Sequence, residues 1–383
     1  MEIGLVKRSF HLHGGGERQL GYLTEGLLTQ GHAVHLFCVS PPTRQSEGIT
    51  YHTLRVMPAP RAFRALGFAL VVRSALRRAG LEVVQSFDRT LGQQIYRAGE
   101  GVHREWVQRK RRSLSTLARG WSHLSVFDRM LLVLERQVLC KTPMIVVNAE
   151  RGRHEISHHY GVPSTRMLTI YNGVDTDRFN ASVRRLRKTQ RTAWGVSAAD
   201  VVLLCVGSGF HRKGLDCAIE ALGELRRRGI GQMRLVVVGK GRPGPYRRLA
   251  RQIGVDDGVR FEGHRADVEH CYAGADLFVL PTRYDPFANT CLEAMACGLP
   301  VLTTTANGAA ELIRDGVNGC ILEAPPTALT FADAVQNLLP CELRVAMGGA
   351  AQQTAGEYPL ARVLTHTLQA YQAIVSQPPM ARS

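Results

Sequence analysis

Residues 201–238 read VVLLCVGSGFHRKGLDCAIEALGELRRRGIGQMRLVVV, and their pattern sets the architecture that we expect. The apolar run over residues 201–206 predicts a buried strand, residues 215–228 show helical periodicity, and residues 234–238 predict a second strand. A glycine-rich and basic segment, residues 207–214, separates the first strand from the helix. Strands that alternate with helices in this way predict a parallel sheet covered by helices.

The same alternation continues along the chain in both directions. Further strands are predicted at residues 3–6, 33–39, 83–86, 144–148, 259–262, 277–280 and 301–303. Further helices are predicted at residues 17–30, 63–79, 113–140 with a break near Gly120, 246–253, 267–273, 290–296 and 309–314. We therefore expect an α/β fold with two parallel sheets, each with helices on both faces.

The length of the chain indicates two domains, because 383 residues exceed the size of one ordinary core. A polar and basic stretch with weak strand signal, residues 178–195, marks the region where the two sheets separate. We assign residues 1–172 to an N-terminal domain and residues 173–357 to a C-terminal domain. We expect a final helix, residues 358–376, to pack back on the first domain.

The composition is typical of a globular protein, with 45% hydrophobic and 21% charged residues. No apolar run reaches the roughly 18–20 residues that cross a bilayer, and the first residues lack the long apolar core of a secretion signal. Nine cysteines without a C-x-x-C pair indicate reduced side chains in a cytosolic protein. No His/Cys spacing suggests a zinc site.

The formal net charge is +16, from 48 basic and 32 acidic side chains. Such an excess favours an anionic partner: a nucleic acid, a membrane surface or a phosphorylated ligand. The alternative is a basic surface that only aids solubility. Basic residues cluster at residues 104–112, 184–191, 226–228 and 242–251. Since the sequence contains no recognition helix, zinc finger or RNA-binding motif, a nucleic-acid-binding protein is the non-enzymatic alternative that charge alone supports.

Two cations, Arg212 and Lys213, lie between a predicted strand and a predicted helix. Fixed cations and backbone N–H groups stabilise the charge that a departing diphosphate gains as its bond breaks. Gly207 and Gly214 allow the backbone to come close to phosphate. The alternative is an ordinary exposed Arg–Lys pair, but cations are unfavourable at a helix N-terminus unless an anion is present. We therefore predict a diphosphate site here.

Residues 283–300 read RYDPFANTCLEAMACGLP and place two carboxylates, Asp285 and Glu293, eight residues apart. A helix is expected to begin near Asn289 and Thr290, where free amides can hold phosphate. Carboxylates accept hydrogen bonds from vicinal hydroxyls, so one can bind a ribose and the other a hexose. The alternative for Glu293 is simple complementarity with the helix dipole. Together the two motifs predict a site for a sugar joined to a nucleotide diphosphate.

These motifs resemble those of glycosyltransferase family 4, the retaining GT-B enzymes. Residues 285–300 are similar to the E-x7-E signature of this family, with aspartate as the first acid. Three further stretches resemble phrases of this family. Residues 207–216 are similar to its phosphate segment, residues 171–179 to its N-G-V-D phrase and residues 14–18 to its GG-x-E-R opening. The resemblance spans nearly the whole chain. It implies two Rossmann-like domains facing a central cleft, the first on the acceptor side and the second binding the donor.

Within this family the chain most resembles the α-1,3-glucosyltransferases that use UDP-glucose to extend the lipopolysaccharide inner core. Residues 96–100, Tyr-Arg-Ala-Gly-Glu, are similar to their Y-R-A-G-[DE] phrase. The resemblance implies a retaining transfer of glucose from a UDP-sugar to a heptose of the inner core, at the inner face of the cytoplasmic membrane. The open alternatives are a mannosyl- or N-acetylglucosaminyltransferase acting on another lipid-linked glycan, and a degenerate member that binds sugar nucleotides without turnover.

The resemblance also implies roles for individual residues. Glu293 would bind the ribose hydroxyls and Asp285 the transferred sugar, while Arg212 and Lys213 would bind the diphosphate. Since the first acid of the signature is usually glutamate, the shorter Asp285 leaves the identity of the sugar open. Glu100 occupies the acidic position near the reacting carbon. The remaining donor-binding candidates are Gly15, Gly16, Gly207, His264, Arg265, Phe287, Ala288, Asn289 and Thr290.

We expect no cofactor and no metal ion. In the related enzymes the departing diphosphate helps to deprotonate the acceptor on the same face of the sugar, and Arg212 and Lys213 would take the place of a metal. A double displacement would instead need a carboxylate nucleophile, for which Glu100 is the candidate. The D-x-D pattern of residues 175–177 falls within the junction phrase, so we interpret it as a coincidence.

Residues 104–123 combine two tryptophans with several cations. Basic segments with tryptophan suit the surface of an anionic membrane, and the resemblance implies a membrane-associated segment in this region. The alternatives are a helical face that binds a phosphorylated acceptor and a solvated surface. For His103 the alternative is a partly exposed surface histidine. The candidates for acceptor or membrane contact are His103, Trp106, Arg109, Lys110, Arg111 and Arg112.

Overall fold

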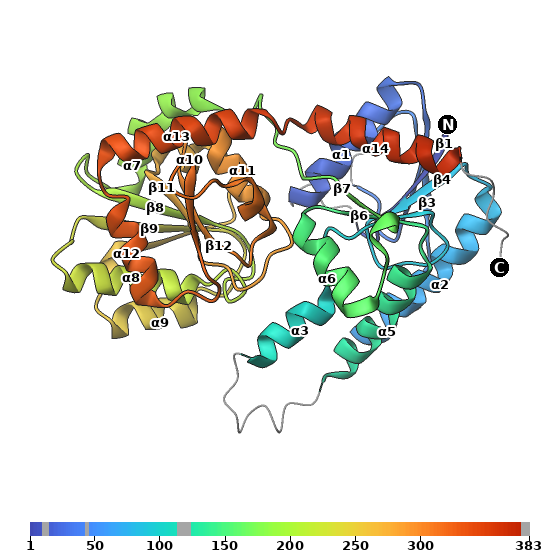
Figure 1. The fold of residues 1–383 in the computed structure, drawn as a ribbon, viewed down its shortest axis with the longest axis horizontal. Helices are drawn as coiled ribbons and strands as arrows, with labels where there is room; N and C mark the ends of the chain where they lie inside the picture. Colours follow the sequence, from blue (N-terminus) through green and yellow to red (C-terminus); the bar gives the residue numbers. More distant parts are fainter. Residues whose placement is uncertain (10–14, 43–45, 113–123, 377–383) are drawn as a thin grey trace. The chain divides into compact units, whose positions relative to one another are not determined.

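The computed structural model describes residues 1–9, 15–42, 46–112 and 124–376. They form two compact units, which we call the N-terminal unit (Met1–Asn172 with Leu360–Ser383) and the C-terminal unit (Gly173–Pro359). Each unit contains one parallel sheet with helices packed against it, as Figure 1 shows. The prediction of an α/β fold with two Rossmann-like parallel sheets is confirmed.

The sheet of the N-terminal unit has the strand order β3-β2-β1-β4-β5-β6-β7, and its neighbouring strands are parallel. The strands are β1 (Glu2–Val6), β2 (Ala33–Cys38), β3 (Ile49–Thr53), β4 (Val83–Ser86), β5 (Ile95–Arg97), β6 (Met144–Val147) and β7 (Met167–Thr169). The helices are α1 (Gly15–Thr29), α2 (Arg61–Ala79), α3 (His103–Arg112), α5 (Val126–Lys141), α6 (Glu150–Tyr160) and α14 (Leu360–Val375). The chain order reverses between β1 and β4, so the switch point of this sheet lies beyond their carboxyl ends.

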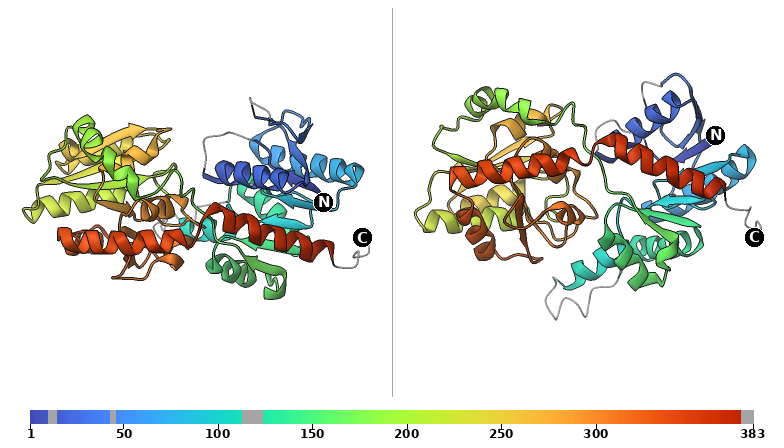
Figure 2. Two further views of the ribbon diagram at one scale, coloured as in Figure 1. Left: turned by 90° about the horizontal axis from the view of Figure 1, so that it is seen from above. Right: turned by 45° about the horizontal axis from the view of Figure 1, so that its top comes forward.

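The C-terminal helix α14 completes the core of the N-terminal unit. Tyr371 of α14 is fully buried in one cluster with Leu5 of β1 and Leu27 of α1. The helices α14 and α1 lie side by side, as Figures 1 and 2 show. Their contact depends on Gly26, because a Cβ at this position would lie 2.4 Å from Cδ2 of Leu364. The last helix of the chain therefore folds with the first unit.

The C-terminal unit has the strand order β10-β9-β8-β11-β12-β13, with parallel neighbours. The strands are β8 (Val201–Val206), β9 (Met233–Val238), β10 (Val259–Gly263), β11 (Leu277–Leu280), β12 (Val301–Thr304) and β13 (Gly319–Leu322). The α-helices are α7 (Arg187–Trp194), α8 (Leu215–Arg227), α9 (Gly244–Gln252), α10 (Val268–Gly274), α11 (Asn289–Ala296), α12 (Ala328–Asn337) and α13 (Cys341–Gly356). Here the order reverses between β8 and β11.

Residues 178–195, which we expected where the sheets separate, lie within the C-terminal unit. Their second half forms α7, whose Arg191 is buried and pairs with Asp276 at 2.9 Å. Arg191 also donates to the carbonyl of Gly274 at 3.2 Å, at the end of α10. Cations are favourable at the carbonyl end of a helix. The basic character of this stretch therefore reflects internal pairing rather than an exposed linker.

Several elements that the sequence did not predict are short or polar. Strands β5 and β7 have three residues each, and β3 is only partly buried, so none of them gives a clear apolar run. Helix α6 reads ERGRHEISHHY and buries Ile156 as its single fully enclosed side chain. The predicted helix at residues 309–314 is a 3-10 turn, η4 (Gly308–Leu312). Of the predicted helix at 113–140, α5 is described; residues 113–123 and the break near Gly120 lie outside the described residues.

Two adjacent glycines of α13 test the packing of the C-terminal unit. A Cβ at Gly348 would lie 2.2 Å from the carbonyl oxygen of Gly298, whereas a Cβ at Gly349 would meet no atom within 4 Å. We expect Gly348→Ala to lower the free energy of unfolding by about 2–3 kcal/mol, since backbone must shift. Gly349→Ala should leave it unchanged or raise it by up to about 1 kcal/mol, because alanine favours helices. Urea unfolding followed by circular dichroism measures both; equal stability of the two variants would contradict this packing.

Candidate functional site

The two sequence motifs meet beyond the carboxyl ends of β8 and β11, at the switch point of the second sheet. The loop after β8 carries Arg212 and Lys213, and the segment after β11 carries Asp285. The carbonyl of Arg212 accepts hydrogen bonds from the backbone N–H of Arg283 at 2.9 Å and from Oγ1 of Thr282 at 2.8 Å. These bonds hold the two segments together.

Asp285 is the centre of this site. Its Oδ2 accepts a hydrogen bond from Nζ of Lys213 at 2.6 Å and another from Nη1 of Arg212 at 2.7 Å. Asp285 and Lys213 are buried, while 34% of the Arg212 side chain is exposed. Burial raises the pKa of Asp285, but the charges of Lys213 and Arg212 outweigh this effect and hold the pKa below its ordinary value. The cluster therefore carries two positive charges and one negative charge at neutral pH.

Gly214 permits the close approach of the two segments. Its φ of +72° lies in the left-handed region, and a Cβ there would lie 1.9 Å from the carbonyl oxygen of Pro281. At Gly207 a Cβ would lie 2.9 Å from Cε of Lys213. Gly207 and Gly214 thus leave the space that Lys213 and the end of β11 occupy.

Asn307 fixes the segment that leads from Asp285 to α11, and the sequence did not single it out. The buried Oδ1 of Asn307 accepts hydrogen bonds from the N–H groups of Ala288 and Ala309, both at 3.1 Å. The N–H of Asp285 donates to the carbonyl of Ala306 at 2.9 Å. A buried amide just after a predicted strand, β12, is the only sequence signal that could have indicated this role.

Helix α11 begins at Asn289 and carries Glu293 on its first turns. Glu293 is buried, and its Oε2 accepts a hydrogen bond from the hydroxyl of the fully buried Tyr272 at 2.8 Å. Burial and the charge of Glu293 both raise the pKa of Tyr272, so this hydroxyl remains a donor. At the start of the helix, Oγ1 of Thr290 is buried and makes no hydrogen bond within the described residues.

The other donor-binding candidates lie at the same edge of the sheet. Phe287 and Ala288 are buried directly before α11, and the N–H of Phe287 donates to Oδ1 of Asp285 at 3.2 Å. His264 and Arg265 follow β10. The guanidinium of Arg265 pairs with Asp267 at 2.6 Å and with Glu262 at 2.9 Å, so its charge is already compensated by carboxylates.

In the N-terminal unit, Glu100 lies just beyond β5 and more than half of its side chain is exposed. Its Oε2 accepts a hydrogen bond from Nη1 of the buried Arg89 at 2.7 Å. Partial enclosure raises the pKa of Glu100, but the charges of Arg89, Lys7 and Arg8 outweigh it, so the pKa lies below its ordinary value. Glu100 is therefore an ionised carboxylate, held by an arginine at the edge of the first sheet.

Glu135 of α5 connects this carboxylate to α3 and was not predicted. It is buried, and its Oε1 accepts from Nη2 of Arg89 at 3.0 Å and from the N–H of His103 at 2.7 Å. Its Oε2 accepts from the N–H of Arg104 at 3.1 Å and from the hydroxyl of Tyr160. One carboxylate thus orients Arg89 and satisfies the first amides of α3. No local motif marks Glu135, because its partners are distant in sequence.

Helix α3 presents the basic candidates. His103 pairs with Asp128 at 3.0 Å; burial and Arg89 lower its pKa more than nearby carboxylates raise it. Trp106 is half-buried, and Arg109 pairs with Glu105 at 2.6 Å. The side chains of Lys110 and Arg111 are exposed, and that of Arg112 lies outside the described residues. None of the described helices has both the length and the apolar character needed to cross a membrane.

The remaining candidates are the glycines at the start of α1 and the D-x-D pattern of residues 175–177. Gly15 and Gly16 are the first two residues of α1, and residues 10–14 before them lie outside the described part of the chain. In the D-x-D pattern, Oδ1 of Asp175 accepts a hydrogen bond from the N–H of Arg178 at 3.1 Å, which closes a turn. Within the described ranges, no group of three or more histidine, cysteine or carboxylate side chains could hold a metal ion.

Two family models match consecutive parts of the chain. The model described as glycosyltransferase family 4 matches residues 13–178, and the model described as glycosyl transferases group 1 matches residues 200–340. The chain is 27% identical over 318 residues to the lipopolysaccharide glucosyltransferase WaaG of Escherichia coli K12, covering 82% of each protein. It is 30% identical to a D-inositol 3-phosphate glycosyltransferase of Actinosynnema mirum over 63% of this chain and 60% of that protein.

Solved structures show the same fold. The crystal structure of WaaG matches with a TM-score of 0.83 at 24% identity, covering 98% of this chain and all of that one. The structure of Anabaena HepE in complex with UDP-glucose matches with a TM-score of 0.76 at 18% identity, covering 97% of this chain. These similarities support the GT-B architecture that the sequence predicts.

The ion cluster around Asp285 predicts a pH-dependent stability. Because the folded pKa of Asp285 lies below its ordinary value, its contribution is fully present above about pH 4 and is lost as the pH falls through the folded pKa. Asp285→Asn should therefore lower the free energy of unfolding by about 2–4 kcal/mol near neutral pH, since Lys213 stays buried without its carboxylate. The difference from wild type should shrink in acid. The exposed Asp177→Asn serves as the control; a loss for Asp285→Asn that is the same at every pH would contradict the cluster.

Proposed function

Because the chain belongs to the glycosyltransferases of group 1 and family 4, we propose that it transfers glucose from UDP-glucose to a heptose of the lipopolysaccharide inner core, with retention of configuration. The observation that carries this proposal is the cluster of Arg212, Lys213 and Asp285 at the switch point of the second sheet. A net positive site beside the start of a helix is suited to a nucleotide diphosphate. Glu293, one helix turn further, offers a carboxylate for ribose hydroxyls.

The reaction that we propose needs no protein nucleophile. The diphosphate lies against Arg212, Lys213 and the first amides of α11. As the bond between the anomeric carbon and the diphosphate oxygen breaks, negative charge grows on that oxygen, and the two cations stabilise it. The acceptor hydroxyl attacks the same face of the sugar and its proton passes to the departing diphosphate. Asp285 keeps both cations in place, and its Oδ1, which accepts the N–H of Phe287, is the oxygen that we propose to accept a sugar hydroxyl as well.

Different observations support the proposed donor and the proposed acceptor. HepE was solved with UDP-glucose, which fits a UDP-sugar as the donor of this chain. WaaG, a lipopolysaccharide glucosyltransferase, is matched over 82% of its length, against 60% for the inositol-phosphate enzyme of A. mirum. The phrase at residues 96–100, which ends in Glu100, also favours the lipopolysaccharide enzymes. We therefore propose that Glu100 and His103 of the N-terminal unit interact with the acceptor.

The alternative acceptors are the soluble D-inositol 3-phosphate and a lipid-linked glycan other than lipopolysaccharide, each with a different donor sugar. The similarity to D-inositol 3-phosphate glycosyltransferases favours testing it. A screen of UDP-glucose, UDP-N-acetylglucosamine, GDP-mannose and ADP-glucose against heptose-terminated lipopolysaccharide and inositol 3-phosphate separates these possibilities. Mass detection of the glycosylated product identifies the pair. Turnover with GDP-mannose or with inositol 3-phosphate alone would contradict the proposed donor or acceptor.

Loss of Lys213 removes a charge that stabilises the departing diphosphate, and loss of Glu293 removes the carboxylate that positions the ribose of the donor. We expect Lys213→Ala and Glu293→Ala each to lower kcat with UDP-glucose by roughly two to three orders of magnitude. Lys188→Ala removes an exposed lysine of α7 and should leave kcat unchanged. The measurement is the rate of UDP release with acceptor present, after circular dichroism has established that each variant is folded. Near-normal rates in both site variants would rule out these assignments.

The exposed end of α3 is proposed to bind an anionic membrane surface. Replacing Lys110 and Arg111 by glutamine should weaken binding to vesicles of phosphatidylglycerol by roughly tenfold or more, because each basic side chain near the surface contributes about 1 kcal/mol. The matched control replaces Arg77 and Arg78, two exposed arginines in the last turn of α2. Co-sedimentation measures the vesicle affinity. An equal effect of both double variants would indicate net charge alone rather than a site on α3.

A further inference from the structure

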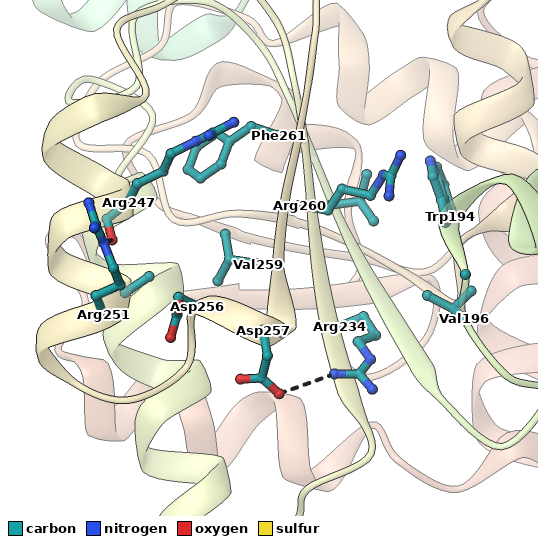
Figure 3. A pocket seen from close by; sticks show the side chains of 14 residues that line it. Trp194, Val196, Arg234, Arg247, Arg251, Asp256, Asp257, Val259, Arg260 and Phe261 are labelled. Atoms are coloured by element: carbon teal, nitrogen blue, oxygen red, sulfur yellow. Dashed lines mark hydrogen bonds and ion pairs between the residues drawn. The ribbon is translucent and has the colours of Figure 1, made fainter.

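The C-terminal unit contains a pocket of about 690 Å³ that the proposed reaction does not use. It is bounded by α9, by β9 and β10 with the turn that leads into β10, and by the end of α7. Trp194 and Val196 enter it from the segment before β8, and Asp256 and Asp257 from the turn before β10, as Figure 3 shows. These segments precede their strands, whereas the donor candidates follow theirs. None of the residues predicted to bind the donor lines this pocket.

Four arginines line the pocket, and they differ in their partners. Arg234 lies 3.7 Å from Asp257, and Arg260 pairs with Glu262. In contrast, the described residues provide no carboxylate within ion-pair distance of Arg247 or Arg251. Both are exposed residues of α9, which belongs to the basic stretch at residues 242–251. The proposed donor site does not use this basic stretch, whereas Arg247 and Arg251 of the stretch line the pocket.

Arg247 and Arg251, which have no carboxylate partner among the described residues, are spaced for a ligand with more than one negative charge; Nε of Arg251 donates a hydrogen bond to the carbonyl of Arg247 at 3.4 Å. Arg247 and Arg251 are four residues apart on α9, so their Cβ atoms lie on one face at a separation of roughly 5–6 Å. The guanidinium of Arg247 lies over the ring of Phe261, 5.4 Å from its centroid, which holds this side chain at the wall of the pocket, as Figure 3 shows. Guanidinium groups bind phosphate oxygens in a fork geometry.

We propose that this pocket binds a small phosphorylated ligand that carries at least two negative charges. Its volume lies within the range of small-molecule sites, which is roughly 300–1,000 Å³. Arg247 and Arg251 contact the phosphate groups, and Trp194 and Phe261 provide the apolar walls. The same chemistry is offered by a free phosphorylated metabolite and by the phosphate headgroup of a membrane lipid.

The sequence supplies a reporter for this pocket. The chain has three tryptophans, of which Trp194 lines the pocket, so the double variant Trp106→Phe/Trp121→Phe has Trp194 as its only indole. In this background, with the donor site filled by UDP, inorganic pyrophosphate should change the Trp194 fluorescence with a dissociation constant on the order of 0.1–1 mM. Adding Arg247→Gln/Arg251→Gln should weaken this binding by roughly tenfold or more. The matched control is Arg248→Gln, an exposed arginine of the same helix that does not line the pocket.

Vesicles distinguish the two sources of the phosphate. A response to phosphatidic acid vesicles, absent with phosphatidylcholine vesicles and lost in the double arginine variant, identifies a lipid headgroup; a response to pyrophosphate identifies a soluble ligand. No fluorescence change with either probe overturns the proposal, as does an equal response of the Trp106→Phe/Trp121→Phe protein with and without Arg247→Gln/Arg251→Gln. UDP binding is measured separately by calorimetry, so failure here leaves the proposed transferase function unaffected.

Discussion

The C-terminal unit depends on one buried carboxylate that holds two adjacent cations. Arg212 and Lys213 are neighbours in a loop, and Lys213 is buried, so without Asp285 their charges would repel each other in a poorly hydrated site. Because Oδ2 of Asp285 accepts from both at 2.6–2.7 Å, the loop after β8 is held to the segment after β11. The glycine at position 214 and the amide of Asn307 serve the same arrangement: one permits the approach of the segments and the other fixes the path to α11.

The N-terminal unit contains a similar arrangement. Buried Glu135 orients Arg89, which in turn holds the exposed carboxylate of Glu100, and the same Glu135 satisfies the first amides of α3. In each unit a buried carboxylate thus positions charged groups beyond the carboxyl ends of the strands, where the strand order reverses. In the transfer reaction that we propose, charge that is fixed in this way would stabilise the transition state without reorganisation during the reaction.

The sequence predicted most of the fold because long parallel strands and amphipathic helices give strong periodic signals. Strands β8, β9 and β11 and helices α8 and α11 were predicted within about two residues, the usual limit of boundary assignment. Short strands such as β5 were not predicted, because three residues are too few to show a periodic pattern. The motif residues Arg212, Lys213, Asp285 and Glu293 could be named from local phrases, but their mutual contacts could not. The roles of Glu135 and Tyr272 are visible only in three dimensions, since their partners are distant in the chain.

The central claim is that the cluster of Arg212, Lys213 and Asp285 receives the diphosphate of a sugar nucleotide. A crystal structure of the protein with bound UDP-glucose tests it most directly. We expect the diphosphate oxygens within hydrogen-bond distance of Arg212 and Lys213, with the ribose hydroxyls on Glu293. Density for the nucleotide elsewhere, with the ion pairs of Asp285 undisturbed and no ligand atom near Lys213, would contradict this account.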